Sequence, residues 1–224
     1  MTASEQLPLD LGHRPALGRT DFLVTDASRE AIGWIDSWPN WPSYGLGIYG
    51  PPGCGKSHLS HVFAAKANAH ILDDNDLRYS NPVVLASEHN ALVWDDANEV
   101  LDEQALFHLF NAVREAGKHF LVVSRAAPAR WTVTLLDLKS RLAGMPAVEI
   151  GMPDDATIMA VLVKLFRDRQ VEVTPDLVDY IGNRVPRTFG AAQALVDQVD
   201  RQALAQNRRI TVPFVRGVLK TFNI

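Results

Sequence analysis

The apolar positions of the chain follow two different periods. Between residues 46 and 150, short runs that are apolar throughout alternate with longer segments in which apolar residues recur every three or four positions. Runs of the first kind are typical of strands buried on both faces of a parallel sheet, and segments of the second kind are typical of helices that cover such a sheet. We predict strands at 46–49, 69–72, 91–94, 119–124 and 147–150, and helices at 56–68, 102–117 and 135–144.

The two ends of the chain follow other patterns. Asp26 can cap a first helix that runs to about Trp38. After residue 150 the strand pattern stops and helical periodicity continues, with Thr174 and Pro175 in the order that favours a helix start. The first 20 residues are punctuated by Pro and Gly. We therefore predict an α/β fold in three parts: a flexible arm over 1–20, a parallel β/α core over 21–150 and a small α-helical domain over 151–224, with helices at 156–170, 174–185, 188–207 and 212–220.

Composition limits the class of protein. Of the 224 residues, 47% are hydrophobic and 21% are charged, as in ordinary globular proteins. The net charge of −4 gives no general attraction to nucleic acid or to an anionic membrane. The single cysteine, Cys54, rules out an internal disulfide and suits a reducing compartment. No apolar stretch approaches the roughly 18 residues that span a bilayer, and the N-terminus does not have the pattern of a signal peptide. We expect a cytoplasmic protein that binds no membrane.

One segment carries a complete phosphate-binding motif. The residues GPPGCGKS, from Gly50 to Ser57, match GxxxxGK[ST] and lie between a predicted strand and a predicted helix. The glycines let backbone N–H groups face a polyphosphate, Lys56 can reach the β- and γ-phosphates, and Ser57 can hold Mg²⁺. A plain Gly/Pro turn is the alternative, but the context favours binding of a nucleoside di- or triphosphate. The predicted nucleotide-binding residues here are Pro52, Gly53, Cys54, Gly55, Lys56, Ser57 and His58.

A second acidic motif follows a buried strand. The run ALVW ends in Asp95 and Asp96, which fits a Walker B element. Asp95 is then placed to organise Mg²⁺, together with Ser57. Asp96 stands where many such ATPases have the glutamate that orients the attacking water. The alternative is a pair of acids that cap the next helix.

Three other features favour ordinary structural roles. His58 and His61 are three positions apart on one helix and could share a metal, but no third ligand lies near them in the sequence, so we favour packing. The acidic stretch from Asp73 to Asp76 is predicted to be a solvated loop rather than a metal site. Cys54 would be oxidisable if exposed, but a small residue at this place in the loop is the simpler interpretation.

Together these motifs resemble the AAA+ ATPases, and among them the DnaA clade, over about residues 20–224. The loop GPPGCGKSHL and the Asp95–Asp96 pair are similar to DnaA. The segment LKSRLAG resembles the one that carries the arginine finger, which implies that role for Arg141. The segment RVPRTFGAAQALV resembles the start of the lid helix that carries the sensor 2 arginine, which implies that role for Arg187. Without the resemblance, Arg141 would be a surface residue paired with Asp137, four positions earlier.

The resemblance also implies a base pocket, and it has limits. In this clade the segment before the first helix forms one wall of the pocket, which here points to Phe22, Leu23 and Val24. The strand at 119–124 ends in Ser124 and Arg125, where DnaA has a sensor 1 residue of the Asn/Asp type, so we expect little or no hydrolysis by the protein itself. The sequence ends at Ile224 without a helix-turn-helix segment, and we expect no sequence-specific DNA binding of its own.

The N-terminal peptide QLPLDL makes the resemblance more specific. A DnaA-like core preceded by such a peptide resembles the Hda family of regulatory inactivators of DnaA. Membership implies a replication regulator that holds ADP or ATP with Mg²⁺, docks on the polymerase sliding clamp and stimulates hydrolysis of DnaA-bound ATP. If the protein forms a homodimer, two arms on one clamp would raise avidity. The residues implied in clamp binding are Gln6, Leu7, Leu9 and Leu11.

Two alternatives of another class remain open. The first is a self-sufficient AAA+ ATPase that turns over ATP in its own oligomer. The second is a helicase loader or transposition helper, which shares the ATPase core but has no reason to carry a clamp-binding peptide.

Overall fold

The computed structural model describes residues 23–97 and 102–221. The predicted clamp-binding residues and Phe22 lie outside these ranges. Two compact units can be distinguished, of which the first ends at Met152 and the second begins at Pro153.

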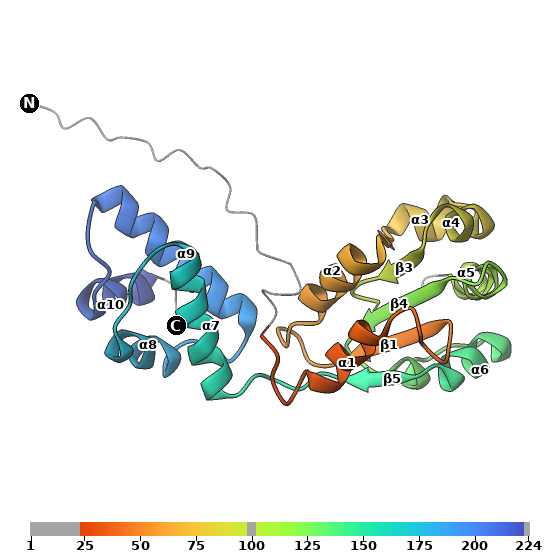
Figure 1. The fold of residues 1–224 in the computed structure, drawn as a ribbon, viewed down its shortest axis with the longest axis horizontal. Helices are drawn as coiled ribbons and strands as arrows, with labels where there is room; N and C mark the ends of the chain where they lie inside the picture. The colour runs from red at the N-terminus through yellow and green to blue at the C-terminus, as the bar shows by residue number, and fades with distance from the viewer. Residues whose placement is uncertain (1–22, 98–101, 222–224) are drawn as a thin grey trace, which may run out of the picture. The chain divides into compact units, whose positions relative to one another are not determined.

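The first unit is built on a parallel sheet with the strand order β2-β3-β4-β1-β5. Each strand is joined to the next through at least one helix, because parallel neighbours need a crossover connection. Figure 1 shows β1 inside the sheet, between β4 and β5. The predicted strands are confirmed, with ends displaced by a residue or so. They are β1 (Gly45–Tyr49), β2 (His70–Ile71), β3 (Ala91–Trp94), β4 (His119–Ser124) and β5 (Ala147–Glu149).

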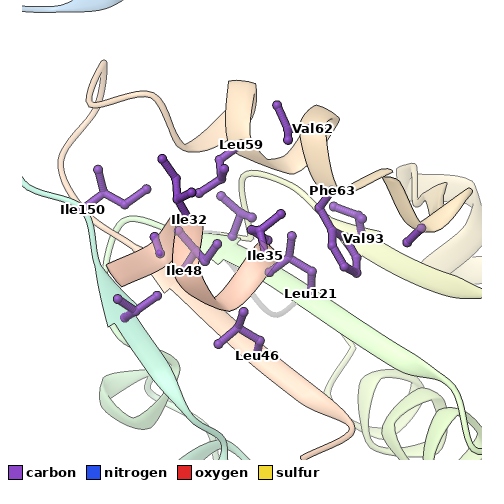
Figure 2. Close-up of a cluster of buried hydrophobic side chains, with 14 of the residues drawn as sticks. Ile32, Ile35, Leu46, Ile48, Leu59, Val62, Phe63, Val93, Leu121 and Ile150 are labelled. Carbon is purple, nitrogen blue, oxygen red and sulfur yellow. The ribbon is translucent and has the colours of Figure 1, made fainter. Parts of the chain in front are cut away.

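Helices cover both faces of this sheet. On one face lie α1 (Arg29–Ser37) and α2 (Lys56–Ala67), whose apolar side chains meet those of the strands in the cluster drawn in Figure 2. The other face is covered by α5 (Glu103–Glu115) and α6 (Leu136–Gly144), and side chains of α3 (Asp74–Tyr79) and α4 (Pro82–Glu88) join the same cluster. A short 3₁₀ turn, η1 (Pro128–Arg130), precedes α6.

The strands are apolar throughout because both of their faces are buried. In β4, Leu121 and Val123 belong to the cluster under α1 and α2, whereas Phe120 and Val122 belong to the cluster under α5 and α6. Successive side chains of a strand point to opposite faces, so an uninterrupted apolar run satisfies both layers. The predicted α/β class with a parallel sheet is confirmed.

Two local predictions are wrong, and one helix has no counterpart among the predictions. The first helix begins at Arg29, after Ser28. Asp26 does not cap this helix but pairs with the side chain of Arg29. The segment from Asp73 is a helix start and not a loop, because the Asp73 carboxylate accepts from the backbone N–H groups of Asn75 and Asp76 in a capping box. The helix α4 was not predicted either.

The second unit consists of helices, as predicted. They are α7 (Asp155–Asp168), α8 (Pro175–Gly182), α9 (Phe189–Gln206) and α10 (Val212–Thr221). Asp154 caps α7 through the N–H of Thr157, and burial of Phe166 and Leu195 forms the centre of the bundle. Among the described residues of both units, no helix is long and apolar enough to cross a membrane.

Candidate functional site

The strand order brings the predicted motifs to one edge of the sheet. In a parallel sheet the carboxyl ends of all strands lie at the same edge, and ligands bind there. Tyr49, at the end of β1, is in register with Ser124, at the end of β4, and Trp94, at the end of β3, is in register with Val122. The phosphate loop, the Asp95–Asp96 pair and the predicted sensor 1 position therefore follow three neighbouring strands.

The backbone of the phosphate loop depends on glycine at Gly50, Gly53 and Gly55. Gly50 has φ +155°, and a Cβ there would lie 2.2 Å from the carbonyl oxygen of Ile150. Gly53 and Gly55 have φ of 80° and 100°, a region that favours glycine. Gly55 ends the loop, and α2 begins at Lys56 without a capping side chain. The first N–H groups of α2 are therefore available to an anion.

Lys56 is held inside this loop. Its side chain is buried, and Nζ donates to the carbonyl oxygens of Gly50 at 2.8 Å and Pro51 at 2.9 Å. The Sγ of Cys54 lies 3.9 Å from the same Nζ. Burial raises the pKa of the Cys54 thiol, and the nearby charge of Lys56 opposes this effect. The thiol is buried, so the condition under which oxidation was expected, exposure, is not met.

A serine that the sequence motifs did not single out connects the two predicted magnesium ligands. The buried Ser60 hydroxyl lies 2.8 Å from the carbonyl oxygen of Ser57 and 2.9 Å from Asp95 Oδ2. The other oxygen of Asp95 accepts from the Asp96 N–H at 2.9 Å. A hydroxyl on the apolar face of α2, between Leu59 and Val62, was the signal that could have identified Ser60.

The backbone of Asp96 has an uncommon conformation. Its φ is +54°, which places a residue without glycine's freedom in the left-handed region. Such residues are found mainly where the surrounding structure fixes them, and they are concentrated at functional sites. The next N–H, of Ala97, donates to Val123 on β4 at 2.7 Å, so the turn that carries Asp96 is tied to the sheet on both sides.

The donor set at this edge fits a nucleoside polyphosphate with Mg²⁺. A buried ammonium, glycines in the left-handed region and the uncapped start of α2 suit phosphate oxygens. The hydroxyl of Ser57 and the carboxylate of Asp95, aligned by Ser60, are the oxygen ligands that Mg²⁺ prefers. A nucleoside polyphosphate would supply the negatively charged phosphate groups that suit this loop.

The predicted sensor 1 residue has another role in this conformation. Ser124 is fully buried, and its hydroxyl donates to the carbonyl oxygen of Ala126 at 2.7 Å. The indole N–H of Trp131 donates to the same oxygen at 3.2 Å. The backbone of Ser124 supports the phosphate loop, because its carbonyl oxygen accepts from the Gly50 N–H at 3.3 Å. Arg125, the next residue, is exposed.

Arg141 lies at the opposite edge of the sheet. It projects from α6, and its Nη1 donates to the phenol oxygen of Tyr44 at 3.1 Å, while its Cζ lies 5.1 Å from the centre of the Phe107 ring. Tyr44 directly precedes β1, whereas the phosphate loop directly follows it. Five strand residues span about 17 Å at 3.3 Å each. The contacts of Arg141 are with these two rings rather than with Asp137.

A small cavity of about 130 Å³ adjoins Arg141. The Nε of Arg141 is buried and makes no hydrogen bond among the described residues. Besides Arg141, the cavity is lined by Ser43, Tyr44, Gly45, Phe110, Ser140, Gly144 and Met145.

The remaining predicted residues lie elsewhere. Arg187, in the second unit, pairs with Asp155 at 2.6 Å. In the first unit, Leu23 is half-buried and Val24 is exposed. His61 Nδ1 lies 2.7 Å from the carbonyl oxygen of Ser57, so its ring is bonded within its own helix. Among residues 23–97 and 102–221, no cluster of three or more His, Cys, Asp or Glu side chains could hold a metal ion, His58 included.

Comparison with known proteins agrees with this architecture. Residues 154–219 match the model of the Hda lid domain. Among solved structures, domain III of the replication initiation protein DnaA from Thermotoga maritima matches with a TM-score of 0.78 at 16% identity, over 93% of this chain and 98% of that one. AMPPCP-bound DnaA from Aquifex aeolicus matches with a TM-score of 0.70 at 20% identity, over 84% of this chain and 66% of that one. A variant of RuvB from Thermotoga maritima matches with a TM-score of 0.68 at 16% identity, over 93% of this chain and 72% of that one. At such identities the structural similarity establishes the fold. The chain therefore has the fold of DnaA domain III, and its residues 154–219 are similar to the Hda lid domain.

Proposed function

We propose that this protein regulates the initiation of chromosome replication by stimulating the hydrolysis of ATP bound to DnaA. In this proposal Arg141 is the arginine finger that reaches the γ-phosphate held by DnaA. The protein's own loop, with Lys56, Ser57 and Asp95, holds ADP or ATP with Mg²⁺ as a structural ligand.

The position of Arg141 is the observation that carries the proposal. Arg141 and the phosphate loop lie at opposite ends of β1, so this arginine is not placed to act on a nucleotide bound in its own subunit. Arginine fingers supplied in trans act on a nucleotide held by a neighbour, and in this proposal Arg141 would act in that way. The match of residues 154–219 to the Hda lid favours DnaA as that neighbour.

The side chains at the carboxyl ends of the strands favour nucleotide binding more than nucleotide hydrolysis. Lys56 and the glycines suit phosphate, but the Ser124 hydroxyl donates to its own turn. A bound nucleotide would stabilise the folded protein by about 4 kcal/mol at a concentration 1,000 times its dissociation constant. Arg187 of the lid would join the same nucleotide after leaving Asp155. Leu23 and Val24, with Phe22, would contact the base.

Replacement of Arg141 by alanine tests the proposal. The measurement is hydrolysis of ATP bound to purified DnaA, in the presence of DNA-loaded clamp. We expect the stimulated rate to fall by about 10³ or more, because fingers supplied in trans contribute 10³–10⁵. Lys139→Ala removes an exposed cation from the same helix and should leave the rate unchanged. Wild-type stimulation by Arg141→Ala would reject the proposal.

A second measurement tests the alternative of a self-sufficient ATPase. ATP turnover by the purified protein alone, if it is lost in Lys56→Ala, would favour that alternative.

The proposed tether to the clamp has its own test. Gln6 offers amide donors and acceptors, and Leu7, Leu9 and Leu11 can fill a small apolar pocket. A titration of purified clamp should show strong binding of the full chain and little binding of a version without residues 1–12. Equal affinity of the two would remove the tether from the proposal, and capture of a replicative helicase instead of the clamp would favour a loader.

A further inference from the structure

The helix that carries Arg141 has no capping side chain of its own. The residue before α6 is Leu135, which cannot accept a hydrogen bond through its side chain. By contrast, α5 and α7 each begin with an aspartate that accepts from the first turn. The N–H groups at the start of α6 therefore have no side-chain acceptor at the N-cap position.

The carboxylate of Glu103, the first residue of α5, bonds to the two residues that directly precede α6. Its oxygens accept from the backbone N–H of Leu135 at 2.6 Å and from the N–H of Thr134 at 2.9 and 3.0 Å. The Thr134 hydroxyl donates to the same carboxylate at 2.9 Å. The backbone N–H groups of Thr134 and Leu135 lower the pKa of Glu103, so the carboxylate is charged at neutral pH and complements the positive end of α6.

The same face of α5 also holds the other end of α6. Phe107 follows Glu103 by four positions, so the two side chains lie on one face of α5. The Phe107 ring lies under the guanidinium of Arg141. α6 also buries Leu138 and Leu142 in the same apolar cluster as Leu106 and Leu109 of α5.

The two kinds of contact constrain α6 differently. Burial of Leu138 and Leu142 keeps α6 against the core through close packing. Hydrogen bonds from two consecutive N–H groups to one carboxylate depend on distance and angle. Glu103 therefore adds a directional restraint at the start of the helix that carries Arg141.

We propose that Glu103 is a positioning residue for Arg141: its carboxylate fixes the start of α6 so that the guanidinium is presented at one defined place beside Phe107. This inference rests on the proposed function, in which Arg141 meets the nucleotide of a partner. A finger displaced by a fraction of an ångström still allows the partners to associate, but it loses contact with the reacting phosphate.

The test uses the full chain and three variants. Glu103→Ala removes all of the acceptors, Glu103→Gln keeps one carbonyl oxygen, and Glu115→Ala removes an exposed carboxylate at the other end of α5. For each variant, stimulated hydrolysis of DnaA-bound ATP is measured over a range of protein concentrations. Affinity for a fluorescent ADP analogue and the unfolding temperature are measured in parallel.

We expect Glu103→Ala to lower the maximal stimulated rate about tenfold, since misplacement of a group by 1 Å can cost about a hundredfold. The concentration that gives half-maximal stimulation and the affinity for the ADP analogue should stay close to wild type. Glu103→Gln should recover part of the rate, and Glu115→Ala should match wild type.

Two outcomes would overturn the inference. One is a wild-type maximal rate for Glu103→Ala. The other is a loss that disappears at excess protein, because that result means only that fewer molecules are folded. In either case Arg141→Ala separates the two proposals: if it still abolishes stimulation, the proposed function stands and only the positioning role of Glu103 falls.

Discussion

The two ends of β1 are built in different ways. At its carboxyl end, consecutive residues form the phosphate loop, and the backbone supplies most of its groups. At its amino end, Tyr44, Phe107 and Arg141 come from three distant segments and meet through side chains. The first end is suited to hold a ligand of the protein itself. At the second end, the guanidinium of Arg141 is held by side chains from two other segments.

Replacement of Gly50 by alanine should give the largest effect and should be confined to the carboxyl end. The new Cβ would lie 2.2 Å from the Ile150 carbonyl oxygen, which is backbone and cannot move aside cheaply. We expect a loss of about 3 kcal/mol in the free energy of unfolding. If the distorted loop loses about the same free energy in its contacts with phosphate, ADP binding would weaken about a hundredfold. Calorimetry and denaturant unfolding measure the two quantities.

Gly33 provides the matched control for Gly50. It lies within α1, and a Cβ there meets nothing within 4 Å. Gly33→Ala should therefore raise the free energy of unfolding by about 0.5–1 kcal/mol, as expected in a helix interior. Wild-type ADP affinity in Gly50→Ala would mean that the loop does not need the observed backbone.

Ser60→Ala should give a smaller effect that depends on magnesium. The substitution leaves Asp95 Oδ2 without its buried donor, which costs about 1–2 kcal/mol. We expect ADP to bind about tenfold more weakly with Mg²⁺ and less affected in the presence of EDTA. Ser140→Ala, which removes a helix-surface hydroxyl bonded to Leu136, is the control. An equal loss with and without Mg²⁺ would contradict a role for Ser60 in aligning Asp95.

Tyr44→Phe probes the amino end with a minimal change. It keeps the ring and removes only the oxygen that accepts from Arg141. We expect ADP affinity to stay unchanged and the maximal stimulation of DnaA-bound ATP hydrolysis to fall about fivefold, in line with about 1 kcal/mol for one hydrogen bond. Tyr79→Phe, at an exposed ring, should match wild type in both assays. A change in ADP affinity would show that the two ends are coupled.

The same contrast explains what the sequence could predict. The phosphate loop is a local motif and the strands are short runs that are apolar throughout, so the sequence predicts both to within a residue or two. The short helices α3 and α4 were missed because their starts are set by Asp73, Asn81 and Pro82 rather than by an apolar period. Asp26 was chosen as a cap for its chemistry alone, but it pairs with Arg29.

The environment of Arg141 could not be predicted from spacing. The hydrogen bond from Arg141 to Tyr44 joins residues 97 positions apart, and those from Thr134 to Glu103 join residues 31 apart. Which distant side chains meet depends on the strand order and on which face of the sheet each helix covers. The resemblance predicts a role for Arg141, but only the packing identifies the residues that contact it.

The last prediction concerns pH at the amino end of the sheet. His119 begins β4 beside the rings of Trp38 and Trp41, with centres 6.2 and 5.4 Å away. Burial lowers the pKa of His119 from its usual value of 6.5. The unfolded chain therefore takes up a proton at a higher pH than the folded protein does. The stability due to neutral His119 is fully present above pH 6.5 and is lost as the pH falls through the lower folded pKa.

A comparison with His119→Phe isolates this residue from the other histidines, because the phenylalanine ring packs but does not titrate. On acidification from about pH 7.5 to 5, wild type should lose more stability than the variant, across the interval that starts near the ordinary histidine pKa of about 6.5. Urea midpoints followed by tryptophan fluorescence measure the difference. Parallel curves would mean that His119 is solvated in the folded protein. A steeper loss in wild type would show that the packing of His119 against Trp38 and Trp41 is sensitive to protonation.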